Sequence, residues 1–295
     1  MPIDQGRYVC AYTDFGFKRL FGTELNKDIL ISFLNSFLNL KDKIVDLSYL
    51  SLEQLGDLVS DRDAIFDVYC KTSDDAYIIV EMQNAVQNYF KDRSIFYSSF
   101  AIGNQAPQGV WNYQLKAVYT IGILNFVLDK DSEPYRHEVV LYDKAVKKQF
   151  YDKLAYYYLE LPKFTKNADE LETIQDKWMF AIKNLSALND KPVALKEQVF
   201  TRLFRIAEIA KFSEKEKYAY EESLKKMWDN YATLESSFTE GQKKRKRRRL
   251  ETRKERRFKT GTRKRFETRN RKRFETRNRR RFKAGTSKYC HKNEK

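Results

Sequence analysis

Apolar residues recur every three or four positions in the first part of the chain. The repeat follows Thr23, a residue type that caps helices, and comprises Leu25, Ile29, Leu30, Phe33, Leu34, Phe37 and Leu38. This spacing is that of one face of an α-helix. It predicts a core-packing helix from Thr23 to about residue 40. The same periodicity predicts a second helix over Val86–Ile102 and helical structure from Asn167 to about Leu234, interrupted near Pro192.

Several runs are instead rich in β-branched and aromatic residues, which favour strands. The predicted strands are Ile44–Leu50, Ala64–Thr72, Ala76–Gln83, Leu115–Leu128, Glu138–Tyr142 and Ala155–Leu161. Ser73-Asp74-Asp75 has the composition of a turn, so the second and third strands are predicted to form a hairpin. The order helix, three strands, helix, strand indicates an α/β fold with a mixed sheet.

Three polar residues interrupt the apolar hairpin: Asp67 on its first strand, and Glu81 and Gln83 on its second. If the turn centres on Asp74, Asp67 lies directly opposite Glu81, with Cβ atoms about 5 Å apart. Two buried carboxylates at that range repel each other, so a shared proton, a cation or solvent must compensate. Mg²⁺ or Mn²⁺ would suit such oxygen ligands. A solvated strand face that carries the two acids without a metal stays open as the alternative.

With its surroundings, Asp67…Glu81-Met-Gln83 resembles the Asp…Glu-x-Lys signature of PD-(D/E)xK nucleases. It is most similar to the Rpn family of recombination-promoting nucleases and transposases, where the third position is often Gln. Three further segments carry the resemblance, which covers about residues 8–235: Asp14-Phe-Gly-Phe-Lys-Arg-Leu-Phe21, Phe90-x-x-Arg93-x-x-x-Tyr97 and Leu159-Glu-Leu-Pro-Lys-Phe164. The resemblance implies an αβββαβ restriction-endonuclease-like core. It also implies Mg²⁺-dependent DNA cleavage in DNA mobility, recombination or defence against foreign DNA.

The resemblance also implies roles for single residues. Asp67 and Glu81 would be metal ligands, and Gln83 would be the third residue of the motif. A neutral Gln83 cannot stabilise developing negative charge as the usual Lys does. The cations Lys18 and Arg93 are therefore candidates to replace it. Two further accessory candidates are Asp14, which could add an acidic group, and Gln105, from the loop after the second helix, which could reach the same cleft. Lys163 is expected at the surface, at a strand end.

Charge divides the 295-residue chain into two parts. Residues 240–295 hold 27 Lys and Arg against 6 Asp and Glu, whereas residues 1–239 hold 30 against 35. The basic tail repeats every eight residues with one apolar position per repeat, at Leu250, Phe258, Phe266, Phe274 and Phe282. One apolar residue in eight cannot build a core, so the tail is predicted to be disordered in isolation. It could bind DNA or RNA through its cations and aromatic rings.

Two origins of the tail stay open. Codons for Arg-Phe-Glu-Thr-Arg-Asn, read one base later, can encode Gly-Leu-Lys-His-Glu-Ile, which is a plausible helical repeat. Members of the family that the chain resembles tend to end in glycine-containing repeats of mixed charge. The tail is therefore interpreted either as a frameshifted helical repeat or as a selected nucleic-acid arm.

Composition excludes several classes of protein. At 42% hydrophobic and 15% aromatic residues the chain has ample material for a core, and no apolar run is long enough to cross a bilayer. No secretory signal opens the sequence. Three isolated cysteines, Cys10, Cys70 and Cys290, fit a reducing cytoplasm. With only His137 and His291, zinc sites and Ser-His-Asp triads lack the necessary residues.

The sequence thus predicts a PD-(D/E)xK-like core over residues 1–165, a helical region over 166–239 and a basic tail over 240–295. The predicted activity is Mg²⁺-dependent hydrolysis of DNA phosphodiesters. The alternative is a nuclease fold that no longer cuts and instead binds DNA or a partner. A toxin-like nuclease acting on RNA is a third option, and homo-oligomerisation stays open.

Overall fold

The computed structural model of the chain describes residues 6–50, 67–86, 89–107 and 109–289, with side chains except for 253–264 and 280–289. Some residues of the segments predicted above lie outside the described residues: 64–66, 87–88, 108 and 290–295. The chain divides into two compact units, Met1–Asp229 and Asn230–Lys295, and each is described by itself.

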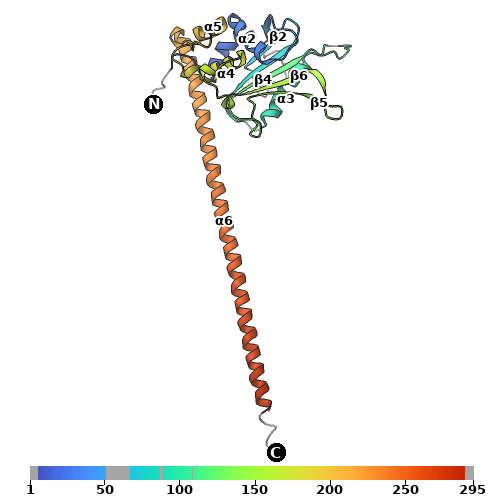
Figure 1. The fold of residues 1–295 in the computed structure, drawn as a ribbon, viewed down its shortest axis with the longest axis vertical. Helices are drawn as coiled ribbons and strands as arrows, with labels where there is room; N and C mark the ends of the chain where they lie inside the picture. Colours follow the sequence, from blue (N-terminus) through green and yellow to red (C-terminus); the bar gives the residue numbers. More distant parts are fainter. Residues whose placement is uncertain (1–5, 51–66, 87–88, 108, 290–295) are drawn as a thin grey trace, which may run out of the picture. The chain divides into compact units, whose positions relative to one another are not determined.

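Within the described residues of the first unit, six strands form one mixed sheet in the order β1-β2-β3-β4-β6-β5 (Figure 1). The strands are β1 (Leu47–Tyr49), β2 (Val68–Thr72), β3 (Tyr77–Gln83), β4 (Val118–Leu124), β5 (Arg136–Asp143) and β6 (Lys148–Glu160). Strands β3, β4 and β6 run parallel, whereas β1–β2, β2–β3 and β5–β6 are antiparallel pairs. The mixed α/β architecture predicted from the sequence is confirmed.

The helices are α1 (Asp14–Phe21), α2 (Lys27–Phe37), α3 (Phe90–Gly103), α4 (Ile174–Asn184), α5 (Gln198–Ala207) and α6 (Glu214–Tyr289). Short 3₁₀ helices occupy Glu24–Asn26, Leu161–Lys163, Ala168–Glu170, Leu185–Ala187 and Ile209–Lys211.

The first helical segment differs from its prediction. Thr23 precedes the 3₁₀ turn and makes no capping hydrogen bond through its side chain, and α2 begins only at Lys27. The cap that the structure uses is Thr13, whose Oγ1 accepts a hydrogen bond from Gly16 N (3.0 Å) and starts α1. Helix α1 was not predicted, because two short turns of helix give little periodicity from which to recognise it.

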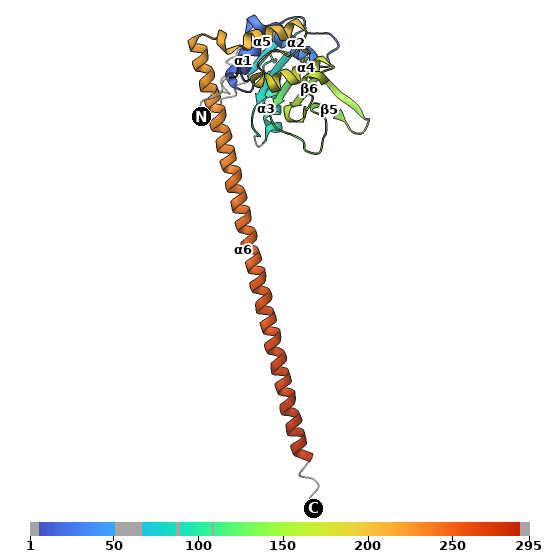
Figure 2. The ribbon, with the colours of Figure 1, turned by 60° about the vertical axis from the view of Figure 1, so that its left-hand side comes forward.

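Side chains alternate between the two faces of the sheet, as the hairpin pattern predicts. Val68, Ile78 and Val80 join the main core with α1, α2, α4 and α5. Tyr69 and Ile79 instead pack against Ala101 of α3 on the opposite face. Figures 1 and 2 show this layered arrangement. The alternation places Glu81 and Gln83, two and four residues beyond Ile79, on the α3 face.

The helices after the sheet share its core instead of forming a region of their own. The ring of Trp178 on α4 lies 6.0 Å from that of Phe21 and 4.8 Å from that of Phe200, between ring centroids. Tyr220 on α6 accepts a hydrogen bond from Cys10 N (2.9 Å) at its hydroxyl. The predicted boundary at residue 165 lies inside the first compact unit, which extends to Asp229.

The structure gives the basic tail a helical backbone, since α6 continues to Tyr289, whereas the sequence predicts disorder. Arg, Lys and Glu are good helix formers, and no proline occurs beyond Pro192 to interrupt them. The prediction that this segment builds no core agrees with the exposure of Leu250, Phe266 and Phe274, at 51%, 66% and 67%. In the part of the chain that is described, no helix has both the length and the apolar character to span a bilayer.

Candidate functional site

The β2–β3 hairpin brings the two predicted acids together. Val68 pairs with Val80 and Tyr69 with Ile79, which is the register predicted from a turn centred on Asp74. Asp67 directly precedes β2, so it lies across from Glu81 at the open end of the hairpin. Its carboxylate Oδ2 accepts a hydrogen bond from Met82 N (2.6 Å), which ties it to the neighbouring strand.

Glu81 is the most enclosed residue of the site, with 4% of its surface exposed. Its Oε2 lies 3.1 Å from Arg93 Nη2 of α3, whereas its Oε1 is buried and has no hydrogen-bond partner within the described residues. Gly122 on β4 pairs with Glu81 in register. A Cβ at Gly122 would lie 3.1 Å from the ring of Tyr158, so the missing side chain lets aromatic residues close over this part of the sheet.

Burial changes the protonation of both acids. It raises the pKa of Glu81 to about 7; the charge of Arg93 opposes this rise, and the charge of Asp67 adds to it. Burial raises the pKa of Asp67 to about 6, while the hydrogen bond from Met82 N lowers it and the charge of Asp14 raises it. The pair is thus a place where a cation would relieve repulsion between two poorly solvated carboxylates.

Helix α1 contributes charges beside Asp67. Asp14 and Lys18 form an ion pair one helical turn apart (2.7 Å), and both lie close enough to influence the pKa of Asp67. Asp14 raises that pKa and Lys18 lowers it, as expected from their signs. The structure therefore brings these two accessory candidates to the predicted site.

Arg93 is a cation in direct contact with Glu81. Its guanidinium also stacks over the ring of Tyr97, 5.1 Å from the centroid, because residues four apart lie on one face of α3. Only about a third of the Arg93 side chain is exposed. The Arg93-x-x-x-Tyr97 motif thus holds one positive charge in place against Glu81.

Gln83 is buried at the end of β3, with 8% of its surface exposed. Its side-chain Nε2 donates a hydrogen bond to Ala85 O (3.3 Å), and its main-chain carbonyl accepts one from Asn125 N (2.9 Å). Asn125 Nδ2 in turn donates to Asn84 Oδ1 (2.8 Å). The sequence interpretation missed this asparagine pair, although each asparagine is the polar residue that directly follows an apolar strand.

Gln105 does not reach the site. Its Oε1 accepts from Lys116 N (2.7 Å) and its Nε2 donates to Ala101 O (3.0 Å). Lys116 precedes the start of β4, where Val118 pairs with Tyr77, and Glu81 lies toward the other end of β3. Gln105 therefore fastens the loop after α3 at the opposite end of the sheet. The position of Gln105 in the sequence does not indicate at which end of the sheet the loop after α3 lies.

The Leu159–Phe164 motif forms a buried ion cluster. Glu160 is fully buried and accepts hydrogen bonds from Leu128 N (2.9 Å) and Lys163 Nζ (3.1 Å), and His137 Nε2 lies 2.7 Å from it. Lys163, expected at the surface, has only 11% of its side chain exposed. It also donates to Asp129 O (2.7 Å), so the motif anchors the loop between β4 and β5.

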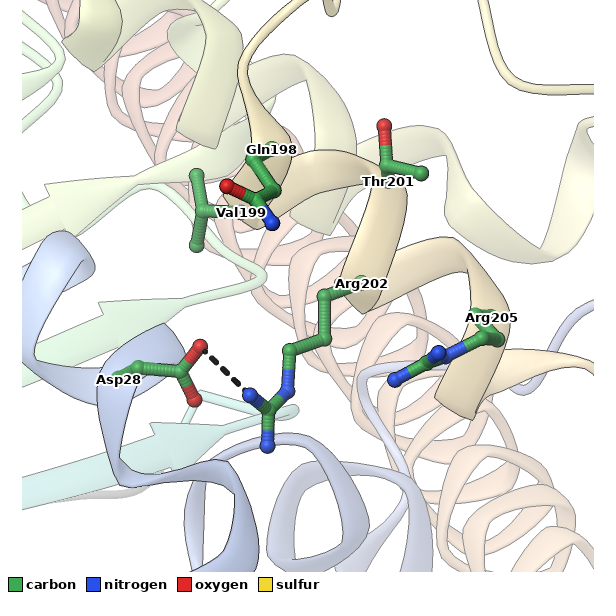
Figure 3. Close-up of a pocket in the computed structure, with 6 residues that line it drawn as sticks. All are labelled: Asp28, Gln198, Val199, Thr201, Arg202 and Arg205. Atoms are coloured by element: carbon green, nitrogen blue, oxygen red, sulfur yellow. Dashed lines mark ion pairs between the residues drawn. The ribbon is translucent and has the colours of Figure 1, made fainter.

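A pocket of about 400 Å³ lies elsewhere, between α2 and α5 (Figure 3). Its lining residues are Asp28, Gln198, Val199, Thr201, Arg202 and Arg205. Arg202 Nη1 is 3.2 Å from Asp28 Oδ2, so the carboxylate of this pocket is already neutralised. None of the predicted site residues lines it.

A divalent metal ion fits the residues present at the hairpin. Glu81 Oε1 is a buried acceptor that has no donor among the described residues, and the carboxylate of Asp67 stands opposite on the neighbouring strand. The described residues hold no group of three or more His, Cys, Asp and Glu side chains that could enclose a metal. A two-carboxylate set of this kind suits Mg²⁺, which commonly keeps waters and takes substrate phosphate oxygens as further ligands.

Comparison with curated proteins and with solved structures gave no match. The model of one protein family, described as PD-(D/E)XK nuclease family transposase, matches residues 11–237. The match spans α1, the hairpin with Asp67, Glu81 and Gln83, and the helices that complete the core. The chain therefore belongs to the PD-(D/E)XK nuclease family transposases.

Proposed function

We propose that this protein is a Mg²⁺-dependent DNA endonuclease that hydrolyses phosphodiester bonds at the hairpin site, with Mn²⁺ as an alternative metal. The observation that carries the proposal is the pair of opposed acids, in which Glu81 is buried and one of its oxygens has no donor in the part of the chain that is described. The family membership supports DNA as the substrate and a role in DNA mobility, recombination or defence.

Each residue of the site has a proposed task. Asp67 and Glu81 hold the metal, which when bound activates a water and neutralises phosphate charge. Gln83, on the same face of β3, orients the attacking water through its amide. Asp14, one helical turn from Lys18, adds to the negative potential beside Asp67 that favours a cation.

Arg93 supplies the positive charge that a neutral Gln83 cannot. Its guanidinium lies against Glu81 and over the face of Tyr97. In this position it can donate hydrogen bonds to a phosphate oxygen on which negative charge develops. Lys18 has the same sign, but it is paired with Asp14 and its side chain is more exposed than that of Arg93.

The test is nicking of supercoiled plasmid by the full-length chain with Mg²⁺, with Mn²⁺ and with EDTA. Glu81→Gln keeps the side-chain shape and removes the charge, so nicking should fall at least about 100-fold. Glu275→Gln makes the same chemical change on the exposed repeat and should retain activity. Equal nicking by both variants would overturn the assignment of the site.

A second candidate function is a nuclease fold that binds DNA without cutting it. The observation that favours it is the Arg93–Glu81 ion pair, because an internal cation already balances part of the charge that a metal would balance. In that case the folded wild-type chain would show no product with Mg²⁺ or Mn²⁺. Isothermal titration with Mn²⁺ would also give no heat that depends on Glu81.

A further inference from the structure

Strands β5 and β6 continue beyond the rest of the sheet as a two-stranded ribbon. Pairing between β4 and β6 begins at Val118 with Leu154, but β5 still pairs with β6 at Leu141–Tyr151, Tyr142–Gln149 and Asp143–Lys148. Among the described residues, the part of β6 before Leu154 therefore has a partner strand on one side only. Figure 2 shows β5 and β6 side by side at the edge of the sheet. Residues 141–153 are called the ribbon below.

The ribbon exposes apolar and aromatic side chains that belong to none of the hydrophobic clusters of the described residues. Their exposed fractions are 44% for Leu141, 53% for Tyr142, 62% for Val146 and 75% for Phe150. An isolated two-stranded hairpin is only marginally stable in water. Large apolar side chains at such a place are a feature of binding surfaces.

The ribbon is also basic, although the body of the protein is acidic. It holds four lysines against two aspartates, whereas residues 1–239 as a whole hold 30 basic and 35 acidic residues. Lys144, Lys147 and Lys148 are exposed, and none of them forms an ion pair within the described residues. One of the two aspartates, Asp143, uses its Oδ1 to accept hydrogen bonds from Ala145 N (2.8 Å) and Val146 N (3.2 Å) of the turn.

The backbone at the tip gives a further indication. Lys147 has a φ of 55°, a left-handed conformation that favours glycine or asparagine. Lysine is an unfavourable choice there if only the turn mattered. The lysine at this position places a positive charge at the end of the ribbon.

From these observations we infer that the ribbon is a contact surface for duplex DNA. Its lysines would neutralise backbone phosphates, and Tyr142 and Phe150 would pack against sugars and base edges. A two-stranded ribbon is one of the two shapes that the major groove admits. The inference deepens the proposed function, on which it rests, by naming duplex DNA as the substrate form and an element that holds it.

The strand register gives the separation along the sheet between the ribbon and the level of the acids. Glu81 is in register with Gly122, which is in register with Tyr158 on β6. Phe150 precedes Tyr158 by eight residues, or about 26 Å of strand. At 3.4 Å per base pair this corresponds to roughly eight base pairs. A substrate bound at both places would therefore span most of one helical turn.

Photo-crosslinking tests the contact without requiring cleavage. The full-length chain carries p-azidophenylalanine in place of Phe150 and is irradiated with a 30-base-pair duplex in EDTA. The control carries the same group in place of Tyr218, which is similarly exposed at 66%. We expect several-fold more DNA adduct from position 150. Because the adduct reports the position of contact, binding by the basic tail cannot produce this difference.

Charge reversal gives a second readout. Lys144→Glu, Lys147→Glu and Lys148→Glu together should weaken duplex binding about tenfold and lower the slope of log affinity against log salt by about 2 to 3. The control reverses Lys41, Lys43 and Lys196, which are exposed lysines outside the ribbon, so net charge changes equally. Thermal unfolding of both variants confirms that they are folded.

Two outcomes would overturn the inference. One is equal duplex affinity for the two charge-reversed variants together with equal crosslinking from positions 150 and 218. The other is a DNA-independent adduct of position 150 with a second copy of the chain, which would make the ribbon a protein interface at the edge strand β5. Failure of the nuclease proposal is recognised separately, as absent plasmid nicking by a chain that still crosslinks to DNA.

Discussion

Phenylalanine and glutamate occur in both units of this protein and behave differently in each. Phe33 in the first unit is fully buried against Phe37 and Trp178, whereas Phe274 in the repeat is 67% exposed. Glu81 is buried, with one oxygen that no described residue contacts by a hydrogen bond, whereas the Glu275 side chain is 59% exposed beside Arg271 (3.4 Å). The comparison shows that burial, and not residue type, turns these side chains into determinants of stability or chemistry.

The largest expected effect comes from the phenylalanines. Phe33→Ala removes a fully buried ring and should lower the free energy of unfolding by about 3–5 kcal/mol. Phe274→Ala should change it by less than about 0.5 kcal/mol, since the ring is exposed. Urea unfolding followed by tryptophan fluorescence measures both. Similar losses for the two variants would break the comparison.

The glutamates should differ in how stability depends on pH. The folded pKa of Glu81 is about 7 against an ordinary value of 4.5, so the folded protein keeps a proton that the unfolded chain releases. The free energy of unfolding therefore falls as pH rises from about 4.5 to 7. In the Glu81→Gln variant the side chain still faces Asp67 and Arg93, but it has no proton to lose over this range. The variant should therefore keep its free energy of unfolding as pH rises and be more stable than wild type by about 1–3 kcal/mol at pH 8.

Urea midpoints at pH 4 and pH 8 in EDTA measure this difference, which should be smallest at pH 4. Glu275→Gln is the matched control and should leave the pH profile unchanged, because an exposed carboxylate is solvated in both states. A Glu81→Gln profile parallel to that of wild type would contradict the argument from burial.

The smallest effect is expected in the repeat helix. Arg271 and Glu275 are four residues apart, and such pairs stabilise a helix by about 0.2–0.5 kcal/mol at low salt. Glu275→Ala removes the pair but introduces the best helix former, so the two effects nearly cancel. Circular dichroism at 222 nm should thus change by only a few per cent. A large loss of helicity would mean that the pair stabilises the helix by more than an exposed ion pair is expected to do.

Much of the candidate site follows from local sequence. The turn at Ser73-Asp74-Asp75 sets the hairpin register, and the two-residue period of strands then places Asp67 opposite Glu81. Both consequences depend on residues close together in the chain. The same reasoning predicted the mixed sheet but began the last strand too late, at Ala155 instead of Lys148, because the ribbon carries no buried face to extend the pattern.

Other parts of the site could not be read from local sequence. Gln105 was expected in the cleft, yet it binds Lys116 at the other end of the sheet. Lys163 was expected at the surface, yet it is enclosed by Glu160 and the backbone of Asp129. In each case the partner lies on another element, and the order in which strands join the sheet decides which ends meet.

The sequence by itself determined the α/β class, the hairpin, its register and the opposition of Asp67 and Glu81, since these depend on periodicity and turn chemistry over a few residues. Only the tertiary structure decided that Arg93 lies against Glu81 and that Gly122 lets Tyr158 close over the site. It also decided that Glu81 Oε1 has no donor among the residues that the structure describes. These features arise where α3, β4 and β6 come together. Burial and charge at such a place depend on contacts between residues far apart in the chain, which no local pattern specifies.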